Sequence, residues 1–575
     1  MREKNSARTM RWLCLGLSTL PALYLSMFIY RFASPLPVHD EWDLVPFILS
    51  MKEGRPSLSL LTQFHGEHPF VIPRLIYAVL ACLFTWDARL GCWVTFVVTV
   101  ATFSLLCWVA INDTSKGELI APVALIPISI FLFGTNQWQN WLRGLQLFWP
   151  IPVLALIAAI AFLSLSSRLP MRLTILVLAT IVAVLSYGNG FLVPLILSVI
   201  FLRQYLAHRN SKTLLELALT AALFVVSLIF LISHQPHSEM HTFNLWKVLR
   251  GVCLVLANPF LDLSLSPEDH LAGSLVLTIL ISLVLASFFV LLVLRGRKIE
   301  ALESPLYSIG FALASCAVLC SAMIAGARGA LSLEDLAQSR YISYAVLLPV
   351  GLTAMSAAIL LKPRTTLRSD SICRAWIYIS IALAVWSLYS EPARLRWGRA
   401  LHDVYEPIFS LLKIAPVFPV DAELSRVITR TDRTDLIKQV SLHRLIRGMI
   451  PPIRHIPERM LVVDDKIGNI DKVTDNLQGG VGIEGWAGLP GKHEVPDASF
   501  VGTLNEDGSV DLLAPILIHK NRPDIQAMGG PSESGWQLHL PNVSSQKNVV
   551  LVVYEWASNN FYRKPVPLRI APHNL

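Results

Sequence analysis

Long apolar runs recur along this chain, and each is long enough to cross a lipid bilayer as a helix. Residues 272–294 and 341–361 each provide about the 20 residues that span a hydrocarbon core. Only 15% of the 575 residues are charged, whereas a soluble domain carries about 25%. The sequence therefore predicts a polytopic α-helical membrane protein, and its net charge of +8 is no argument for binding nucleic acid.

Basic residues in the loops between these runs predict the topology. The positive-inside rule places the loops at 168–172, 203–212, 295–298 and 362–374 in the cytoplasm, together with the basic N-terminus. The crossings that follow are residues 11–32, 90–111, 119–135, 147–167, 172–187, 190–204, 213–233, 272–294, 305–326, 341–361 and 375–390. This odd number puts everything after residue 390 on the outer side, opposite the N-terminus.

Two further apolar stretches leave the helix count open, between about 11 and 13. Residues 70–86 and 244–260 carry the aromatic and basic residues typical of helices that lie in the membrane interface. If both crossed instead, every loop between them would change sides. The first run, residues 11–32, lacks an A-x-A cleavage site, so we expect a retained helix rather than a signal peptide.

The pattern changes near residue 458. Short alternating segments separated by turn residues predict an all-β, sandwich-like domain over residues 458–575. Residues 1–390 form the predicted transmembrane domain, with an outer loop at 33–69, and residues 391–457 form a basic helical connector along the membrane surface. Three tryptophans of the β domain are either core residues or a platform for sugar: Trp486, Trp536 and Trp556.

An acidic cluster, His39-Asp40-Glu41-Trp42-Asp43, lies within ten residues of the first predicted helix. Carboxylates at this place cannot serve the fold of a buried helix. They can accept a proton from a nucleophile, ligate a metal, or lie exposed without a role. The cluster is therefore a candidate for chemistry at the membrane surface.

The same outer loop contains His65, Glu67 and His68. Together with Asp40 these residues could hold a divalent cation, but a His-x-Glu-His sequence in a loop is more often unliganded. The eight cysteines lie in or beside apolar segments and show no metal-ligand spacing. No metal site is therefore assigned from the sequence, and a divalent cation stays a possibility.

Other polar residues gather in loops predicted to lie on the outer side. Arg328 and Arg340 suit a phosphate because a planar guanidinium donates two hydrogen bonds, but they could equally anchor lipid headgroups. The amides and indoles of residues 136–146 are typical of sugar contacts, or of an interfacial tryptophan belt. The turn 186–190 has a helix-breaking glycine pair and either lines the same site or forms a plain hairpin.

These motifs together resemble the GT-C superfamily of polyprenyl-phosphate-sugar-dependent glycosyltransferases, which includes protein O-mannosyltransferases and the aminoarabinose transferases of lipid A. The resemblance covers roughly residues 10–390. It rests on the acidic pair Asp40-Glu41, the stretch His65–Arg74, the turn Trp86-Asp87-Ala88-Arg89 and the polar turn Ser186–Gly190.

The resemblance implies a role for each candidate residue. Asp40 would be the catalytic base with Glu41 as its partner, and Arg340, with Arg328, would bind the donor phosphate. Substrate contacts are expected from the other polar residues of these motifs and of the outer loops: His65, Glu67, His68, Arg74, Asn140, Gln146, Asn189 and Tyr341.

The chain departs from the family pattern in three places. Asn189 stands near where relatives have a lysine, which weakens the case for a phosphate contact there. The acidic cluster contains Asp43 as well as the pair, so Asp43 is an alternative base. A C-terminal β domain is not shared by the whole superfamily, and resembles the tails of some bacterial members.

The implied activity is transfer of a sugar from a polyprenyl-phosphate donor in the outer leaflet of the lipid bilayer to a glycan, lipid or protein acceptor in the periplasm. Two other functions stay open. One is a polymerase or ligase of lipid-linked polysaccharides. The other is a transporter or flippase of lipid-linked glycans, which would carry charged or helix-breaking residues at mid-membrane depth.

Overall fold

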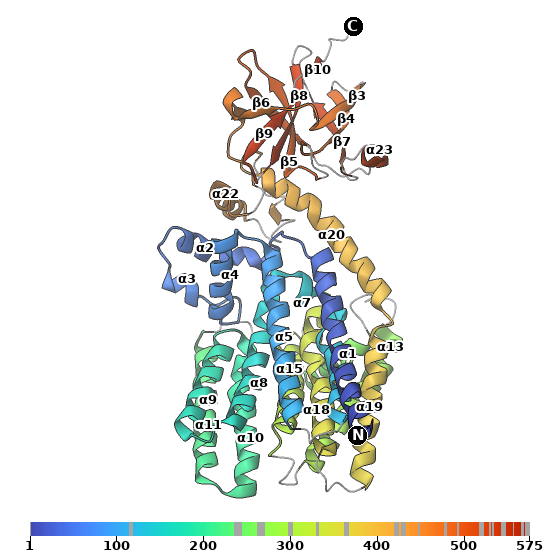
Figure 1. The fold of residues 1–575 in the computed structure, drawn as a ribbon. Coiled ribbons are helices and arrows are strands. Elements are labelled where there is room, and N and C mark those ends of the chain that lie inside the picture. Colours follow the sequence, from blue (N-terminus) through green and yellow to red (C-terminus); the bar gives the residue numbers. More distant parts are fainter. Residues whose placement is uncertain are drawn as a thin grey trace. The chain divides into compact units, whose positions relative to one another are not determined.

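The computed structural model of the protein describes residues 2–569 apart from short segments. Those left out are residues 114–118, 235–243, 262–270, 297–302, 329–332, 362–366, 419–424, 427–432, 447–448, 477–479, 491–493, 517–521, 528–530, 532–533, 542–547, 556 and 565–567. Contacts divide the chain into two compact units (Figure 1). The helical unit comprises Met1–Ala33, Glu53–Tyr77 and Ala88–Leu401, and the β unit comprises Ser34–Lys52, Ala78–Asp87 and His402–Leu575.

Long apolar helices build the helical unit, as predicted for a multi-pass membrane protein. Nine helices of the described chain are long and apolar enough to cross a membrane, or ten if one bent pair counts as a span. The longer helices of this part of the chain, whether or not they are candidate spans, are α1 (Arg2–Phe32), α5 (Ala88–Asn112), α6 (Ile120–Leu132), α8 (Pro150–Leu165), α9 (Leu169–Val184), α10 (Leu192–His208), α11 (Ser211–His234), α12 (Leu245–Leu261), α13 (Leu271–Arg295), α15 (Pro305–Arg328), α18 (Leu347–Leu360), α19 (Leu367–Ser387) and α20 (Glu391–Ile414).

The nine spans coincide with nine of the predicted crossings. The other two predicted crossings differ from a simple span. Helix α9 is shorter than 18 residues, and α19 meets α20 at a bend of 44°, so that the two helices pass the length test only as a pair. The apolar pattern thus located every membrane-length helix in the described chain, but not the bend.

The two stretches left open by the sequence both form helices that are short for a span. Helix α4 (Val71–Phe84) has 14 residues, which rise about 21 Å, against about 30 Å of hydrocarbon. Helix α12 has 17 residues and is not among the candidate spans. Along α4, Leu75, Val79 and Leu83 are exposed. Such a stripe is typical of a helix that lies in the membrane interface, and this position of α4 stays a prediction.

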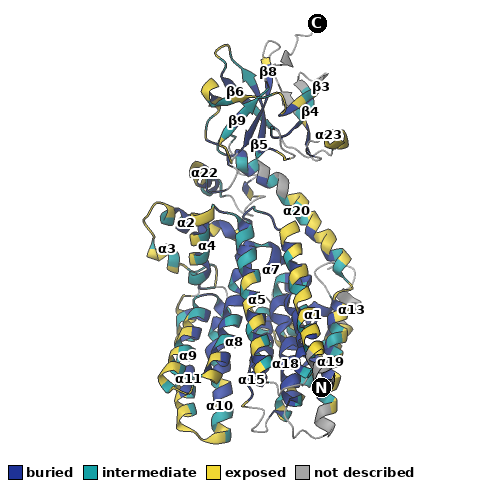
Figure 2. Cartoon of the chain, in the orientation of Figure 1, coloured by how far each residue is buried: buried dark blue, intermediate teal, exposed yellow. Residues whose placement is uncertain are grey.

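Burial differs between helices of the helical unit in the way a membrane requires. Every residue of an 18-residue window in the span Ser339–Leu360, which contains α18, is buried, whereas only 22% of the corresponding window of α11 is buried (Figure 2). Glycines let α18 approach α15 closely, because a Cβ at Gly351 would lie 2.4 Å from the carbonyl oxygen of Gly310. The exposed apolar side chains of the outer helices suit contact with lipid rather than water.

Two sheets form the core of the β unit. One has seven strands, in the order β1-β6-β5-β8-β9-β2 with β10 beside β8, and the other has the order β3-β4-β7. The strands are β1 (His455–Ile456), β2 (Leu461–Val463), β3 (Gly468–Asn476), β4 (Gly480–Ala487), β5 (Ala498–Leu504), β6 (Val510–Ile516), β7 (Gly535–Pro541), β8 (Asn548–Glu555), β9 (Asn560–Arg563) and β10 (Leu568–Arg569).

Strand β8 is buried on both faces, because its alternate residues pack in two different cores. Val549, Leu551 and Val553 share a core with Ile483 and Trp536 of the smaller sheet. The residues between them pack against the predicted connector in a core formed by Val550, Val552, Tyr554, Ile414, Val417, Ile450 and Ile456. The second part of the connector is therefore built into the β unit.

The tryptophans of the β domain have different environments. Trp536 is 1% exposed and belongs to the core between the two sheets, as expected of a core residue. Trp486 on β4 is half-buried, and Trp556 lies outside the described residues.

Candidate functional site

The residues predicted for one site fall in both units. The acidic residues Asp40, Glu41 and Asp43 belong to the β unit, and all other predicted site residues belong to the helical unit. Each group therefore has its own geometry, built by its own unit.

The acidic cluster forms a short 3-10 helix, η1 (His39–Leu44). Its first residue, His39, adopts a positive φ of 54°, which turns the chain into the helix. The Trp42 side chain is fully buried, and its indole N–H donates to the carbonyl oxygen of Pro37 at 2.9 Å. Trp42 therefore fixes the helix from its inner side.

The three carboxylates of this helix have three different environments. Glu41 is 1% exposed, and its Oε2 accepts a hydrogen bond from the backbone N–H of Val38 at 3.0 Å. Asp43 forms an ion pair with Arg433. Asp40 is exposed, and no described residue bonds to its carboxylate. Glu41 therefore caps the helix, and Asp40 is the carboxylate left open to an incoming group.

In the helical unit, His65 and His68 close a tight hairpin. The backbone N–H of each donates to the carbonyl oxygen of the other, at 2.8 and 3.1 Å. Gly66 makes the turn possible with a φ of +57°. Glu67 is exposed at its tip. Across the described chain, no group of three or more His, Cys, Asp or Glu side chains is arranged to hold a metal.

This hairpin packs on the polar turn η4 (Gly188–Phe191). The His68 ring lies 4.2 Å from the Tyr187 ring, and Tyr187 stacks on Phe148 at 4.3 Å. A Cβ at Gly188 would lie 2.4 Å from Nδ1 of His68, so a glycine is required where the two motifs meet. The structure thus brings together two motifs that are more than 100 residues apart in the sequence.

Two of the expected substrate residues make internal contacts. Arg74 is 3% exposed, and its Nη1 donates to the carbonyl oxygens of Leu61 and Gln63 at 2.8 and 2.5 Å. Asn189 donates from Nδ2 to Sγ of Cys320 at 3.4 Å. Arg74 therefore closes the loop that precedes α4, a structural role that the sequence did not predict.

Residues 135–149 break into short helices, η2 (Thr135–Gln137), α7 (Trp138–Leu142) and η3 (Gly144–Phe148). They are joined to a second broken segment, η6 (Ser339–Tyr341). Asn140 donates from Nδ2 to the Arg340 carbonyl oxygen at 3.1 Å, and the Arg340 N–H donates to Oε1 of Gln139 at 3.1 Å. Irregular backbone at membrane depth persists only inside protein or beside water.

Around this junction, polar atoms are buried without partners. We call this group the polar cluster. Six side-chain atoms that belong to it have no hydrogen-bond partner among the described residues: Asn136 Oδ1, Gln137 Oε1, Trp138 Nε1, Asn140 Oδ1, Trp149 Nε1 and Arg340 Nε. An unsatisfied buried polar group costs about 1–3 kcal/mol. This concentration indicates a place that a polar ligand or water fills.

Arg340 gives the polar cluster a positive charge. Its guanidinium lies over the Tyr341 ring at 5.1 Å, and it forms no ion pair with any carboxylate that the structure describes. Gln146 of η3 is also buried, at 7% exposure. Arg328 is the last residue of α15, and its side chain lies outside the described part of the chain. Of the two arginines expected to bind the donor phosphate, the structure therefore describes the side-chain contacts of Arg340 alone.

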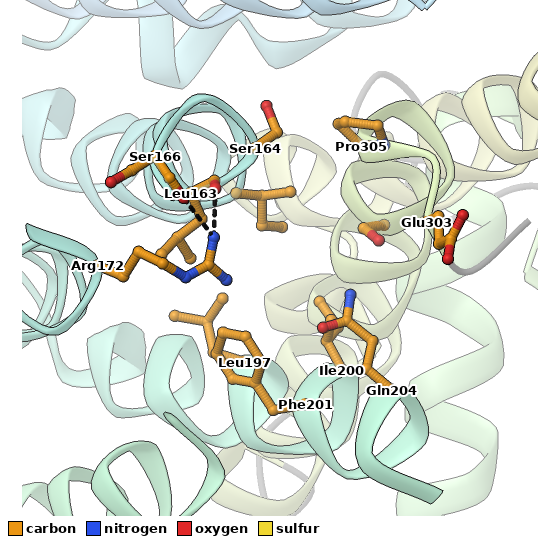
Figure 3. A pocket seen from close by; sticks show the side chains of 12 residues that line it. Leu163, Ser164, Ser166, Arg172, Leu197, Ile200, Phe201, Gln204, Glu303 and Pro305 are labelled. Carbon is orange, nitrogen blue, oxygen red and sulfur yellow. Dashed lines mark hydrogen bonds between the residues drawn. The ribbon is translucent and has the colours of Figure 1, made fainter. Parts of the chain in front are cut away.

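A separate cavity of about 230 Å³ lies between α8, α9, α10 and α15, and none of the predicted site residues lines it (Figure 3). Arg172 extends into this region, pairs with Glu216 and donates from Nη1 to the carbonyl oxygens of Leu163 and Ser166. These contacts cap the end of α8 and neutralise the charge. The cavity adjoins loops predicted to be cytoplasmic and is not part of the candidate site.

An apolar cavity of about 280 Å³ lies between α10, α13 and α15. Leu195, Phe289 and Leu319 are among the side chains that line it. Leu319 directly precedes Cys320, the residue that accepts the Asn189 amide. The sequence gave no separate signal for this cavity, because its lining residues read as ordinary membrane-spanning residues.

Comparisons of the chain with protein-family models, with curated protein sequences and with solved structures gave no match.

Proposed function

We propose that this protein is a membrane glycosyltransferase that moves a sugar from a polyprenyl-phosphate donor to a glycan, lipid or protein acceptor on the periplasmic side of a bacterial inner membrane. The observation that carries the proposal is the division of roles in η1. Glu41 is used as a cap and Asp43 as an ion-pair partner, while Asp40 alone is exposed without a partner among the described residues.

Asp40 has the properties that a general base needs. It accepts the proton of the acceptor hydroxyl while that oxygen attacks the anomeric carbon of the donor sugar. The new carbon–oxygen bond forms as the bond to the phosphate breaks, through an oxocarbenium-like transition state. The electron pair of the broken bond leaves with the polyprenyl phosphate, so no acid is needed on the leaving group.

The polar cluster supports the donor side of the proposal. Arg340 has no carboxylate partner in the described chain, and its Nε is buried without a hydrogen bond. A guanidinium in this state suits a phosphate whose negative charge grows as the sugar leaves. The unpartnered amide oxygens and indole N–H groups nearby match the donors and acceptors of sugar hydroxyls.

The apolar cavity between α10, α13 and α15 suits the isoprenoid chain of such a donor. Its lining is almost entirely aliphatic and aromatic, with Ser315 as the one polar residue. A lipid tail held there buries apolar surface without leaving polar groups unsatisfied. This role is part of the proposal and is open to the same test as the donor itself.

The test is donor turnover by purified protein in lipid nanodiscs. Undecaprenyl-phosphate sugars and membrane glycolipid acceptors are supplied to wild type and to the Asp40→Asn, Asp43→Asn and Glu53→Gln variants. We expect Asp40→Asn to lower the release of undecaprenyl phosphate by about 10²- to 10⁴-fold, the usual contribution of a general base. Glu53, an exposed carboxylate of the same outer loop, is the matched control and should leave turnover unchanged.

Three outcomes would contradict the proposal or redirect it. Loss of turnover with Asp43→Asn alone would move the base to Asp43. Transfer of whole glycan chains rather than single sugars would make the protein a polymerase or ligase. No turnover with any donor, together with movement of a lipid-linked glycan across the bilayer, would make it a transporter.

A further inference from the structure

We propose that Arg433 is a positioning residue, through which the connector and the β domain hold the acidic helix η1 in place. The consequence for catalysis rests on the proposed function, whereas the consequence for the helix itself does not. The carrying observation is that η1 belongs to the same compact unit as residues 402–575 and is attached to them by the Asp43–Arg433 ion pair.

The ion pair is partly shielded from water. The side chains are 24% exposed at Arg433 and 38% exposed at Asp43, so solvent screens the pair less than it screens a fully exposed one. The Arg433 backbone is also fixed, because its N–H donates to Oγ of the buried Ser425 at 2.9 Å. A guanidinium on such a backbone aims its hydrogen bonds in one direction.

Arg433 stands at the start of α22 (Thr434–Leu442), which is anchored in the β unit. Ile437 and Val440 on this helix are buried. After its last turn, Arg444 donates from Nη2 to the Tyr554 hydroxyl of β8 at 2.8 Å. The path from the sheet through α22 to Arg433 is therefore made of buried side chains and direct hydrogen bonds.

A second attachment holds the other side of η1. The backbone N–H of Trp86 donates to the carbonyl oxygen of Leu445 at 2.8 Å. Leu445 directly follows Arg444 in the chain. The Trp86 ring meets the Trp42 ring edge to face at 5.4 Å, and both rings are buried. The connector thus contacts η1 directly at Asp43, and reaches Trp42 through Trp86.

The position of the ion pair bears on Asp40 because of the geometry of a 3-10 helix. Residues three apart in such a helix lie above one another, so the Asp40 and Asp43 side chains share one face of η1. The charged and titratable groups on this helix are His39, Asp40, Glu41 and Asp43, and Arg433 of the connector pairs with Asp43. Arg433 therefore neutralises the carboxylate that shares this face of the helix with the proposed base.

Removing Arg433 should therefore have two effects. The helix η1 loses its attachment to Arg433, and the negative charge of Asp43 beside Asp40 is no longer neutralised by that guanidinium. A like charge favours the protonated form of a neighbouring carboxyl group. The acid limb of the pH–rate profile should accordingly move to higher pH, an effect that loss of folding stability alone does not produce.

The experiment compares Arg433→Gln, Arg433→Lys, Asp43→Asn and the double variant Asp43→Asn/Arg433→Gln with wild type, all as full chains in nanodiscs. Lys438→Gln is the matched control, because Lys438 forms an exposed ion pair with Asp435 on the same helix α22. Hydrogen exchange of the peptide that covers η1 is measured first, since it requires no substrate. Turnover and its pH profile are measured second.

We expect Arg433→Gln to speed exchange in η1 by about three- to tenfold, in keeping with the loss of one charge-assisted pair. Arg433→Lys should restore part of the protection, and Lys438→Gln should match wild type. The double variant should exchange no faster than either single variant, because both singles remove the same contact. Turnover of Arg433→Gln should fall through kcat, with the KM for the donor unchanged.

The outcomes separate this proposal from the proposed function. Unchanged exchange in η1 for both Arg433→Gln and Asp43→Asn would overturn the positioning role, whatever the activity. Faster exchange in a protein whose wild type releases no polyprenyl phosphate would support the positioning role and reject the glycosyltransferase. If Arg433→Gln fails to fold, Asp43→Asn removes the same pair from the smaller side chain and decides the question.

Discussion

The acidic helix and the polar cluster are both polar regions of a largely apolar chain, but they satisfy their polar groups in opposite ways. In η1, the Glu41 carboxylate accepts a hydrogen bond from the backbone N–H of Val38, and the Trp42 indole donates one to the carbonyl oxygen of Pro37. Asp43 forms an ion pair with Arg433. In the polar cluster, six buried side-chain atoms have no partner in the described structure. Three polar side chains of η1 are thus engaged within the protein, whereas the six atoms of the polar cluster are not.

The difference indicates a division of labour. A helix whose Glu41, Trp42 and Asp43 side chains are engaged within the protein holds the open carboxylate of Asp40 at a fixed place, as chemistry demands. Buried donors and acceptors without partners instead raise the free energy of the unliganded protein, and a polar ligand or water that bonds to them lowers it again. Under the proposed function, the acidic helix serves the chemical step, and the polar cluster serves the donor.

Asp40→Asn is expected to have the largest effect of any single change. Turnover should fall by about 10²- to 10⁴-fold, because the amide cannot accept the proton of the acceptor. Hydrogen exchange in η1 should stay as in wild type, since Asp40 holds no contact that the structure describes. A loss of activity accompanied by faster exchange in η1 would mean that Asp40 supports the helix, and the contrast between the regions would fail.

Arg340→Gln should weaken binding of the donor and leave the rate of the chemical step unchanged. Loss of charge-assisted hydrogen bonds to a phosphate is worth about 1.5–3 kcal/mol, which is about 10- to 100-fold in affinity. We expect a rise of that size in the KM for the donor, measured by steady-state turnover. Arg250→Gln, which removes an exposed arginine of α12, is the control. An unchanged KM would separate Arg340 from the donor phosphate.

The membrane helices were predictable because each one carries its own signal. An apolar run of about 20 residues specifies a span without reference to any other part of the chain. The acidic cluster was found in the same way, from its position after α1. Contacts between distant segments have no such signal. Arg433 pairs with an aspartate 390 residues earlier, and the sequence around either residue does not predict the contact.

Arg74 shows the same limit from the other direction. Its place in the His65–Arg74 motif made it a candidate for binding substrate, but a motif in a sequence does not reveal whether the loop before it has free carbonyl oxygens. Those of Leu61 and Gln63 accept its hydrogen bonds. The double burial of β8 is a further case, because only the fold shows that the connector covers its second face. Asn140 was a candidate from its amide alone, and its unpartnered Oδ1 keeps it one.

Glu41→Ala tests whether the buried carboxylate is a cap or a chemical partner of Asp40. The change leaves the Val38 N–H without its acceptor, and loss of a helix cap costs about 0.5–2 kcal/mol. We expect faster hydrogen exchange in η1 together with a moderate loss of turnover. Glu41→Gln keeps an acceptor oxygen and should be milder in both measurements. Abolished turnover with unchanged exchange would instead assign Glu41 a chemical role.

The smallest expected effect comes from two matched substitutions, Trp42→Phe and Trp149→Phe. Both residues are buried, and both changes keep an aromatic ring while removing an indole N–H. The Trp42 N–H is bonded to Pro37, whereas the Trp149 N–H has no partner among the described residues. Trp42→Phe therefore loses a hydrogen bond and leaves a carbonyl oxygen unsatisfied, while Trp149→Phe removes an atom that was already unsatisfied.

We expect the local free energy of opening to fall by about 1 kcal/mol more for Trp42→Phe than for Trp149→Phe in the absence of substrate, as measured by hydrogen exchange of the surrounding peptides. For donor affinity we expect the opposite order, with the larger effect from Trp149→Phe. If the Trp149 N–H serves the sugar or its phosphate, Trp149→Phe weakens binding and Trp42→Phe does not. Equal effects of the two changes on local opening and on donor binding would show that the unpartnered atoms of the polar cluster do not bind the donor. A group that bonds to a ligand must affect the free energy more when the ligand is bound than when it is absent.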